Sequence, residues 1–325
     1  MRAAVCSSYG GPDQVSVAEI DPPPLGPGQA RIAVRAAAVN YPDVLVMADK
    51  YQISVPLPFV PGSEMAGTII EVADDVQGLA VGDLAIGTAI AGGFAEEVVL
   101  GASAVIRLPP GADLQRAAAF GVAHRTAYHV LRSVARVQPG EELVVLGAGG
   151  GVGLAAVQLG ALLGATVTAV ASSAEKLAVA QELGATRVLD HRGADVRSAL
   201  KELVPGGTDV VVDPVGGALA EPALRSLHYG GRFVTVGYAS GEVPRIPLNL
   251  VLLKGIEIVG FQFIDFVGHH TDEWTRNEAE LLDLFVSGRA TPHIGATFPL
   301  DRVAEALQLV ADGGAIGKVV IDLGT

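Results

Sequence analysis

The chain has 325 residues, of which 50% are hydrophobic and 18% are charged, so it can fill buried cores, and its length suits two domains. Its formal net charge of −13 argues against nucleic acid and anionic membrane surfaces as partners, because phosphate contacts need clusters of Lys and Arg. Cys6 is the single cysteine, which excludes an intrachain disulfide and a cysteine-rich zinc site.

The first third of the chain contains short β-patterned runs at 30–34, 67–72 and 96–100, separated by proline-containing segments at 22–24 and 56–61. Short strands separated in this way by turn-forming segments predict antiparallel, barrel-like β structure. The first residues lack the apolar core of a signal peptide, so we expect a cytoplasmic protein.

The pattern changes near residue 117, where a predicted helix over 117–135 begins an alternation of strands and helices. Strands are predicted at 142–146, 166–171, 187–189, 209–212, 232–236 and 257–259. Helices are predicted between them at 151–163, 174–183, 194–203 and 218–227. The helices end close to glycines that suit a left-handed cap, namely Gly164, Gly184, Gly206 and Gly230. Six strands with intervening helices predict an α/β protein with a doubly wound parallel sheet.

The last part of the chain is predicted to hold helices at 271–286 and 301–311 and a closing strand at 318–323. The simplest architecture is a nucleotide-binding domain inserted into a β-rich domain whose last part returns at the C-terminal end. The uncharged stretch 143–174 is long enough to span a bilayer, but glycines interrupt it and its apolar period changes midway. We therefore interpret it as a buried strand, a turn and a buried helix.

A glycine-rich turn joins the strand at 142–146 to the following helix, with Gly149, Gly150 and Gly151 at its centre. Such a turn lets the backbone reach a pyrophosphate, and the helix N-terminus offers free N–H groups to it. The strict Gly-x-Gly-x-x-Gly spacing fails at Val152, although a frame shifted by one position fits with an alanine first. Its setting among βα units favours a dinucleotide site over a purely structural turn, and the absence of Gly-Lys-Ser/Thr argues against a P-loop.

The residues after the second strand of this domain favour NADPH over NADH. NADH-type sites place an acidic residue there, whereas this strand ends in Ala171, Ser172 and Ser173, with no acid before Glu175. Hydroxyl donors followed by Lys176 suit a 2′-phosphate. The serines also suit a helix N-cap, and the two roles are compatible.

Motifs typical of one enzyme family are spread over almost the whole chain, among them Ala-Ala-Val-Asn-Tyr-Pro-Asp at 37–43 and Asp-Pro-Val-Gly-Gly at 213–217. The others lie at 58–67, 82–83, 92–96, 125–128, 147–153, 230–237 and 317–321. Together they resemble the zinc-independent quinone oxidoreductases of the medium-chain dehydrogenase/reductase superfamily. The resemblance implies a GroES-like domain built from residues 1–121 and 265–325, a Rossmann domain over 122–264, and NADPH in the cleft between them.

The resemblance also implies a set of cofactor contacts. They are Thr126, Gly149, Gly150, Gly151, Val152, Ser172, Lys176, His191, Gly237, Phe261, Phe263 and Lys318. The glycine turn would meet the pyrophosphate, and Thr126 would lie near the nicotinamide ribose. His191 stands where relatives often have a tyrosine beside the adenosine phosphate. The two phenylalanines and Gly237 would line the nicotinamide side, and Lys318 would close the pocket.

Zinc ligands known from the superfamily are missing here. Zinc-dependent members carry a histidine in a Gly-His-Glu motif, whereas this chain has Gly62-Ser63-Glu64. They also carry a cysteine near the position of Asn40 and four more in a separate lobe. We therefore expect no metal site.

On the substrate side, Asn40 and Tyr51 are the predicted catalytic residues. A quinone or enone gains negative charge on oxygen as hydride arrives, and neutral hydrogen-bond donors stabilise that charge. The alternatives are a turn-forming asparagine and a core tyrosine. Asp43 is interpreted as a helix cap and Glu64 as structural; no histidine is assigned a catalytic role. No general acid is evident, so the product would take its proton from water.

The sequence thus predicts an NADPH-dependent, zinc-independent reductase of quinones or related conjugated carbonyls. A 2-alkenal or enoyl thioester reductase remains an alternative, as does a dinucleotide-binding protein with little turnover. The strand over 256–260 is the expected edge of the parallel sheet, and a bare apolar edge invites pairing, so we expect a symmetric homodimer joined there.

Overall fold

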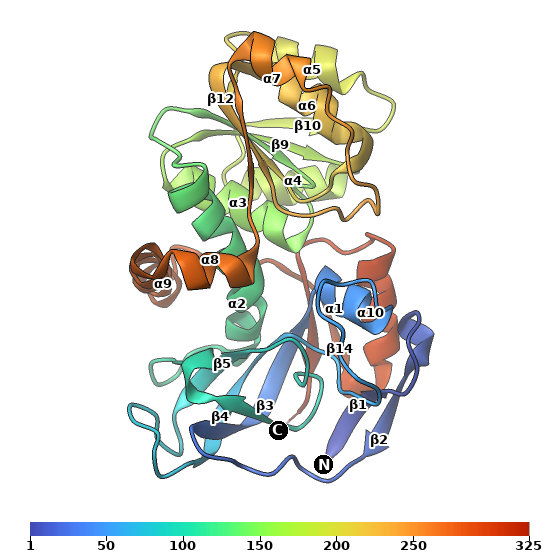
Figure 1. Ribbon diagram of the computed structural model, residues 1–325, viewed down its shortest axis with the longest axis vertical. Helices are drawn as coiled ribbons and strands as arrows, with labels where there is room; N and C mark the ends of the chain where they lie inside the picture. Colours follow the sequence, from blue (N-terminus) through green and yellow to red (C-terminus); the bar gives the residue numbers. More distant parts are fainter. Residues whose placement is uncertain (325) are drawn as a thin grey trace. The chain divides into compact units, whose positions relative to one another are not determined.

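A computed structural model of the chain describes residues 1–324 (Figure 1). It divides into two compact units, one formed by Met1–Val122 together with the chain from Thr291 onward, and one formed by Ala123–Ala290. The chain passes from the first unit to the second within helix α2 (Leu114–His129).

The first unit is built on a seven-stranded, mostly antiparallel sheet of order β14-β15-β3-β4-β5-β7, with β6 also paired to β3. A separate hairpin pairs β1 with β2. The strands are β1 Arg2–Cys6, β2 Val15–Glu19, β3 Gln29–Val39, β4 Glu64–Val72, β5 Leu84–Thr88, β6 Glu97–Gly101, β7 Val105–Arg107, β14 Ile294–Pro299 and β15 Lys318–Asp322. The helices are η1 Pro12–Gln14, α1 Tyr41–Met47, η2 Ala102–Ala104, η5 Leu300–Arg302 and α10 Val303–Ala311. The predicted β-rich domain is confirmed.

The long strand β3 organises the core of this unit. Its side chains alternate between the two faces, and Ala30, Ile32 and Val34 are fully buried. Helix α10 packs its apolar side against the same core. Strand β4 pairs with β3, and the two backbones are so close that a Cβ on Gly67 would lie 1.9 Å from the Ala33 carbonyl oxygen, so glycine is required there.

The second unit contains six parallel strands in the order β10-β9-β8-β11-β12-β13. They are β8 Glu142–Leu146, β9 Thr166–Ala171, β10 Arg187–Asp190, β11 Thr208–Asp213, β12 Leu227–Thr235 and β13 Glu257–Gly260. The other elements are a π-helical turn η3 Val130–Val134, α3 Gly151–Leu162, α4 Ala174–Glu182, α5 Val196–Leu203, η4 Gly217–Leu219, α6 Ala220–Ser226, α7 Asn249–Lys254, α8 Phe263–His269 and α9 Thr271–Val286. The predicted doubly wound sheet is confirmed, with its strand order reversing between β8 and β11, the place where such sheets bind ligands.

The structure corrects the predicted domain boundary at residue 265. Helices α8 and α9 belong to the second unit, and the chain returns to the first at Thr291. The reason is a polar and aromatic interface with α2, in which Glu278 bonds Arg125 and His129. The turn after α5 also differs from the prediction, because Gly207, with φ +87°, takes the left-handed conformation in place of Gly206.

Candidate functional site

The glycine-rich turn of the second unit joins β8 to α3. The Gly150 N–H donates to the Gly147 carbonyl at 3.0 Å, and Gly147 has φ +60°. A Cβ on Gly153 would lie 2.1 Å from that carbonyl oxygen, so the first turn of α3 closes directly on the loop. Gly150 is the N-cap and α3 begins at Gly151, which leaves the first N–H groups of the helix without intrahelical acceptors. The turn therefore presents backbone donors suited to a pyrophosphate.

A small basic pocket follows β9. Ser173 is the N-cap of α4 and accepts the Lys176 N–H at 3.2 Å, which leaves Ser172 as the hydroxyl beside the Lys176 ammonium, 3.5 Å away. The aliphatic stem of Lys176 lies over Gly149, where a Cβ would come within 2.5 Å of it. Burial, together with the nearby charge of Arg192, lowers the pKa of Lys176.

Arg192 is a basic residue that the sequence analysis missed. It is exposed after β10, pairs with Asp190 at 3.0 Å, and lies near enough to Lys176 to affect its ionisation. His191 precedes it, and its backbone N–H donates to Ala171 at 3.1 Å. The adjacency of His191 and Arg192 in the sequence was the available signal, but only the pairing of β10 with β9 brings Arg192 to this pocket.

The residues expected on the nicotinamide side occupy several elements of the second unit. Thr126 is buried on α2, and Gly237 follows β12. Phe261 is buried after β13, and Phe263 begins α8 at 6.3 Å from it, ring centre to ring centre. Phe263 also packs edge-on against Trp274 of α9. The two phenylalanines therefore belong to the aromatic interface that fixes α8 and α9.

A polar cluster lies in the first unit where the ends of β3, β4 and β15 meet in the sheet. The Lys318 ammonium donates to Asn40 Oδ1 at 2.5 Å and to a Glu64 carboxylate oxygen. Asn40 Nδ2 donates to the same Glu64 oxygen at 2.9 Å and to Ser63 Oγ at 3.2 Å. The other Glu64 oxygen accepts the Val122 N–H at 2.6 Å. Lys318, Glu64 and Asn40 are 4%, 0% and 8% exposed, whereas Ser63 is partly exposed.

This cluster changes the interpretation of two predicted residues. Lys318 was expected to close the cofactor pocket, but its ammonium is buried in an ion pair, because a buried Glu64 carboxylate needs a countercharge. Both amide hydrogens of Asn40 have acceptors inside the cluster. The amide orientation is fixed by its partners, since lysine only donates and a carboxylate only accepts.

Asp43 is a buried titratable group beside the cluster. Its Oδ2 accepts the Asn40 backbone N–H at 2.8 Å at the start of α1, which agrees with the predicted cap. Its Oδ1 has no hydrogen-bond partner among the described residues. Burial raises the pKa of Asp43 to about 7, against the opposing effects of Asn40, Ser63 and Lys318. The sequence analysis did not predict the raised pKa of Asp43. The position of Asp43 in the sequence indicates a helix cap, but it does not reveal that the side chain is buried.

Tyr51 lies on the loop after α1, half-buried against the core of the first unit. Burial and the charge of Asp43 raise the pKa of its phenol, so the hydroxyl keeps its proton at neutral pH and can donate a hydrogen bond. Among residues 1–324, no three His, Cys, Asp or Glu side chains come together as a metal site.

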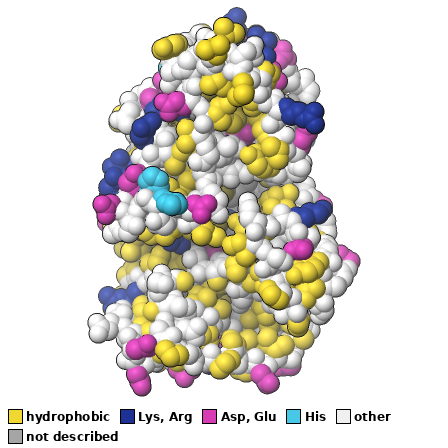
Figure 2. Space-filling model, viewed as in Figure 1, with side chains coloured by type: hydrophobic (Ala, Val, Ile, Leu, Met, Phe, Trp, Pro, Cys, Tyr) yellow, Lys and Arg dark blue, Asp and Glu magenta, His cyan; other side chains and the backbone are white. Residues whose placement is uncertain are grey.

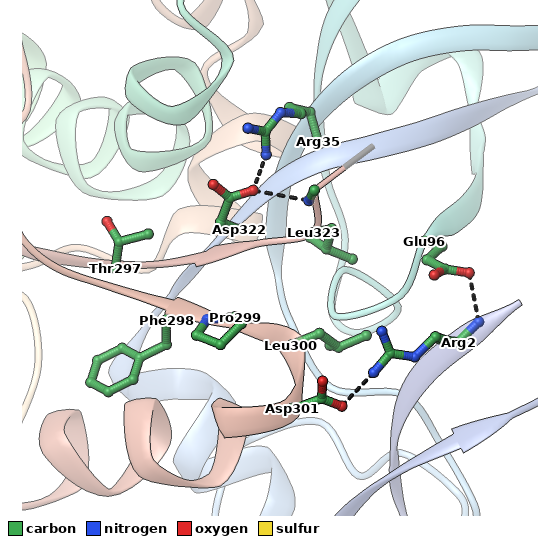
Figure 3. A pocket seen from close by; sticks show the side chains of 11 residues that line it. Arg2, Arg35, Glu96, Thr297, Phe298, Pro299, Leu300, Asp301, Asp322 and Leu323 are labelled. Atoms are coloured by element: carbon green, nitrogen blue, oxygen red, sulfur yellow. Dashed lines mark hydrogen bonds and ion pairs between the residues drawn. The ribbon is translucent and has the colours of Figure 1, made fainter.

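A cavity of about 430 Å³ in the first unit lies apart from these residues (Figure 3). Its arginines are already paired, Arg2 with Asp301 and Arg35 with Asp322, and Arg2 also bonds Glu96 through its backbone N–H. Each arginine that lines the cavity is therefore already paired with a carboxylate, and the Arg35 pair ties β3 to β15.

On the face that Figure 2 displays, Lys and Arg lie in small groups among Asp and Glu and do not gather in one large basic patch. Within the described part of the chain, no helix is both long and apolar enough to cross a bilayer.

Comparison with known proteins identifies two family models along the chain. Residues 26–110 match the alcohol dehydrogenase GroES-like domain, and residues 151–284 match the zinc-binding dehydrogenase model. The quinone oxidoreductase-like protein 2 homolog of Nematostella vectensis is 37% identical over 99% of this chain and 88% of its own length. Human quinone oxidoreductase is 31% identical over 99% and 97%. The solved quinone oxidoreductase of Thermus thermophilus, also determined in complex with NADPH, is 31% identical, covers 99% of this chain and 100% of its own, and has a TM-score of 0.86.

Proposed function

Because this chain belongs to the zinc-independent quinone oxidoreductase family of the medium-chain dehydrogenase/reductase superfamily, we propose that it transfers hydride from NADPH to quinones or related conjugated carbonyls without a metal. It is an oxidoreductase that uses NADPH. The observation that carries the proposal is the second unit's glycine turn beside a basic pocket that lacks an acidic residue at the end of β9. We place the reaction in the cytoplasm.

The basic pocket accounts for the choice of NADPH. A 2′-phosphate would receive hydrogen bonds from the Ser172 hydroxyl and the Lys176 ammonium, with Arg192 adding a second positive charge. We expect Lys176→Ala to raise the Kd of NADPH about tenfold or more, because charge-assisted hydrogen bonds are worth roughly 1.5–3 kcal/mol each. The Kd of NADH should stay the same, since NADH lacks the phosphate.

The measurement is a titration of both cofactors at low and high salt, with Lys201→Ala on the exposed side of α5 as the matched control. The preference for NADPH should shrink at high salt in the wild-type protein and less so in Lys176→Ala. Equal dissociation constants for the two cofactors in the wild-type protein would overturn this assignment.

The acceptor side is assigned to the first unit. A quinone spreads the charge that arrives with hydride over its own π system, so hydrogen bonds suffice where an alkoxide would require a metal. Tyr51 supplies a protonated phenol, and Asn40 is held in the polar cluster by hydrogen bonds from its amide nitrogen to Ser63 and Glu64. We expect removal of either residue to lower the rate without abolishing it.

The acceptor class is decided by steady-state oxidation of NADPH with a panel of small quinones, 2-alkenals and enoyl thioesters. The proposal expects the highest kcat/KM with a quinone. A clear preference for an alkenal or thioester would move the protein to those reductases. Cofactor binding without oxidation in any assay would favour the dinucleotide-binding alternative.

An apolar surface of the second unit supports the proposed homodimer. It comprises the ends of β12 and β13 and helix α7, and its exposed members are Tyr229, Leu248, Leu252, Leu253 and Ile258, the first three being 82%, 78% and 82% exposed. These elements are contiguous, because β13 pairs with β12, and the Tyr229 ring lies against Gly255 at the end of α7. Exposed apolar groups beside a free strand edge favour pairing with a second copy.

Sedimentation at micromolar concentration should therefore give a dimer. Leu252→Asp should give a monomer, because it would place a carboxylate in the apolar interface. Val81→Asp, which changes an equally apolar residue that is 67% exposed on the first unit, should leave the dimer intact. A wild-type monomer would contradict the proposed assembly.

A further inference from the structure

Ser63 is the member of the polar cluster that is least buried. We propose that the Ser63 hydroxyl is the hydrogen-bond donor to the acceptor's carbonyl oxygen, and that Lys318 and Asn40 are positioning residues that polarise it. This inference rests on the proposed function and names the group through which the cluster acts.

The polar atoms of the Asn40 side chain already have hydrogen-bond partners within the first unit. Its oxygen accepts from Lys318, and its two amide hydrogens are directed to Glu64 and Ser63. A direct bond from Asn40 to a substrate would require one of these bonds to break. The bond to Ser63 Oγ measures 3.2 Å, and the same amide nitrogen lies 3.5 Å from the Ala38 carbonyl oxygen.

Ser63 differs from its neighbours in its exposure and in having a hydroxyl that both accepts and donates. Lys318, Glu64 and Asn40 are at most 8% exposed, whereas Ser63 is partly exposed. A hydroxyl can accept two hydrogen bonds and donate one. Because Ser63 Oγ accepts from Asn40, its O–H proton can be donated either to the Asp43 carboxyl beside it or to a substrate oxygen.

The cluster also makes this hydroxyl a better donor. The bonds run in one direction, from the Lys318 ammonium to the Asn40 oxygen and from the Asn40 amide to Ser63. Hydrogen bonds aligned in this way polarise one another, most strongly where water is excluded. The positive end of the chain is held in place by Glu64, which is fully buried.

Asp43 is the competing acceptor for the Ser63 hydroxyl. Burial raises the pKa of Asp43 to about 7, and Ser63, Lys318 and Asn40 favour its ionised form, whereas Glu64 disfavours it. Tyr51 also interacts with its charge. At about pH 6 the carboxyl is mostly neutral and competes weakly, so the inference is best tested there.

In the reaction, hydride from NADPH forms a bond to the acceptor, and an electron pair moves onto the carbonyl oxygen. Ser63 donates a hydrogen bond to that oxygen and keeps its own proton. The oxygen then takes a proton from water, so that NADPH, a quinone and one proton give NADP⁺ and the hydroquinone.

The test is Ser63→Ala, assayed at pH 6 with the best quinone of the panel. We expect kcat to fall about 100-fold, at the lower end of the effect of an oxyanion donor. The Kd of NADPH should not change, because the cofactor turn lies in the second unit. Ser63→Thr restores the hydroxyl and should recover most of the rate, and Ser103→Ala, an exposed serine of the same unit, should match the wild type.

The role of Lys318 is tested by a double-mutant cycle. Lys318→Met combined with Glu64→Gln removes the buried ion pair while keeping similar side-chain volumes. In that background, Ser63→Ala should lower kcat by a much smaller factor than it does in the wild type, because the hydroxyl is no longer polarised. If Ser63→Ala lowered kcat by the same factor in both backgrounds, the positioning role of Lys318 would be overturned.

Wild-type kcat in Ser63→Ala would overturn the whole inference while leaving the proposed function in place. A wild-type protein that reduces none of the panel would overturn both.

Discussion

Glu278→Ala is expected to lower the free energy of unfolding of the second unit by about 3 kcal/mol, because it leaves the partners of a largely buried carboxylate without their acceptor. The Glu278 carboxylate bonds the Arg125 guanidinium at 2.8 Å and His129 Nε2 at 2.9 Å, and its side chain is 18% exposed. Burial alone would raise the pKa of Glu278, but the His129 hydrogen bond and the Arg125 charge outweigh it and lower this pKa.

The tautomer of His129 follows from Asn277. The oxygen of Asn277 accepts from Arg276, so its amide nitrogen donates to His129 Nδ1 and to Ser133. His129 therefore carries its proton on Nε2, which donates to Glu278. In Glu278→Ala both this N–H and the Arg125 guanidinium lose their carboxylate.

Denaturant unfolding followed by tryptophan fluorescence measures the effect directly. Trp274 is the single tryptophan of the chain, and its ring stacks on His129 at 4.4 Å. Glu273→Ala on the same helix is the control, since the pairs of Glu273 with His270 and Arg276 are more than one-third exposed and such pairs contribute at most about 1 kcal/mol. Equal losses of unfolding free energy in the two variants would show that the Glu278 pair stabilises the protein no more than a surface contact does.

The same pair predicts a pH dependence. A lowered pKa means that Glu278 contributes its full stabilisation above its ordinary value of 4.5 and loses it as the pH falls through the lowered pKa. The difference in the free energy of unfolding between the wild type and Glu278→Ala should therefore become smaller at acidic pH. A difference that is constant down to pH 2 would contradict the ion pair as its source.

Gly153→Ala is expected to raise the Kd of NADPH more than about 100-fold, a loss of about 2.7 kcal/mol. The added Cβ would lie 2.1 Å from the Gly147 oxygen and 2.8 Å from the Ala148 Cα, both of them backbone atoms that cannot swing away. The turn must open, and the N–H groups at the start of α3 then move away from the pyrophosphate. Two such hydrogen bonds, at roughly 1.5–3 kcal/mol each, account for the loss.

The control for this variant is Gly206→Ala, because an added Cβ there meets no atom within 4 Å. Calorimetric titration should give wild-type affinity for Gly206→Ala and little or no binding for Gly153→Ala. A melting temperature for Gly153→Ala close to that of the wild type would confine the effect to the turn. Unchanged affinity in Gly153→Ala would show that this turn does not hold the cofactor.

Much of the fold could be predicted from local patterns in the sequence. Strands β8 and β9 were predicted at their observed bounds, because each is a short, mostly apolar run between turn residues. The seven-residue helix α1 was anticipated only through Asp43 as its cap, and its bounds were not predicted, since it begins at Tyr41-Pro42 directly after a long strand. The boundary at 265 failed because the polar interface that holds α9 on α2 joins residues about 150 positions apart.

For the candidate sites too, features formed by neighbouring residues could be predicted, whereas contacts between distant residues could not. The glycine turn and Lys176 are contiguous in sequence with the elements that carry them, so their pattern was visible. The cluster around Asn40 joins three strands that are distant in the chain, and Lys318 lies 278 positions from Asn40. Only the register of the sheet reveals that they meet, and only burial reveals the raised pKa of Asp43.

The central claim is metal-free hydride transfer from NADPH to a quinone, and one measurement tests it most directly. The protein is treated exhaustively with a chelator, and NADPH oxidation is followed with the best quinone, alongside NADP⁺ reduction with ethanol or benzyl alcohol. Simple alcohols require stabilisation of an alkoxide by a metal, and Ser63 stands where zinc-dependent members of the superfamily carry a ligand histidine. We expect undiminished quinone turnover and negligible alcohol oxidation. Loss of quinone turnover on chelation, with recovery on adding zinc, would contradict the account.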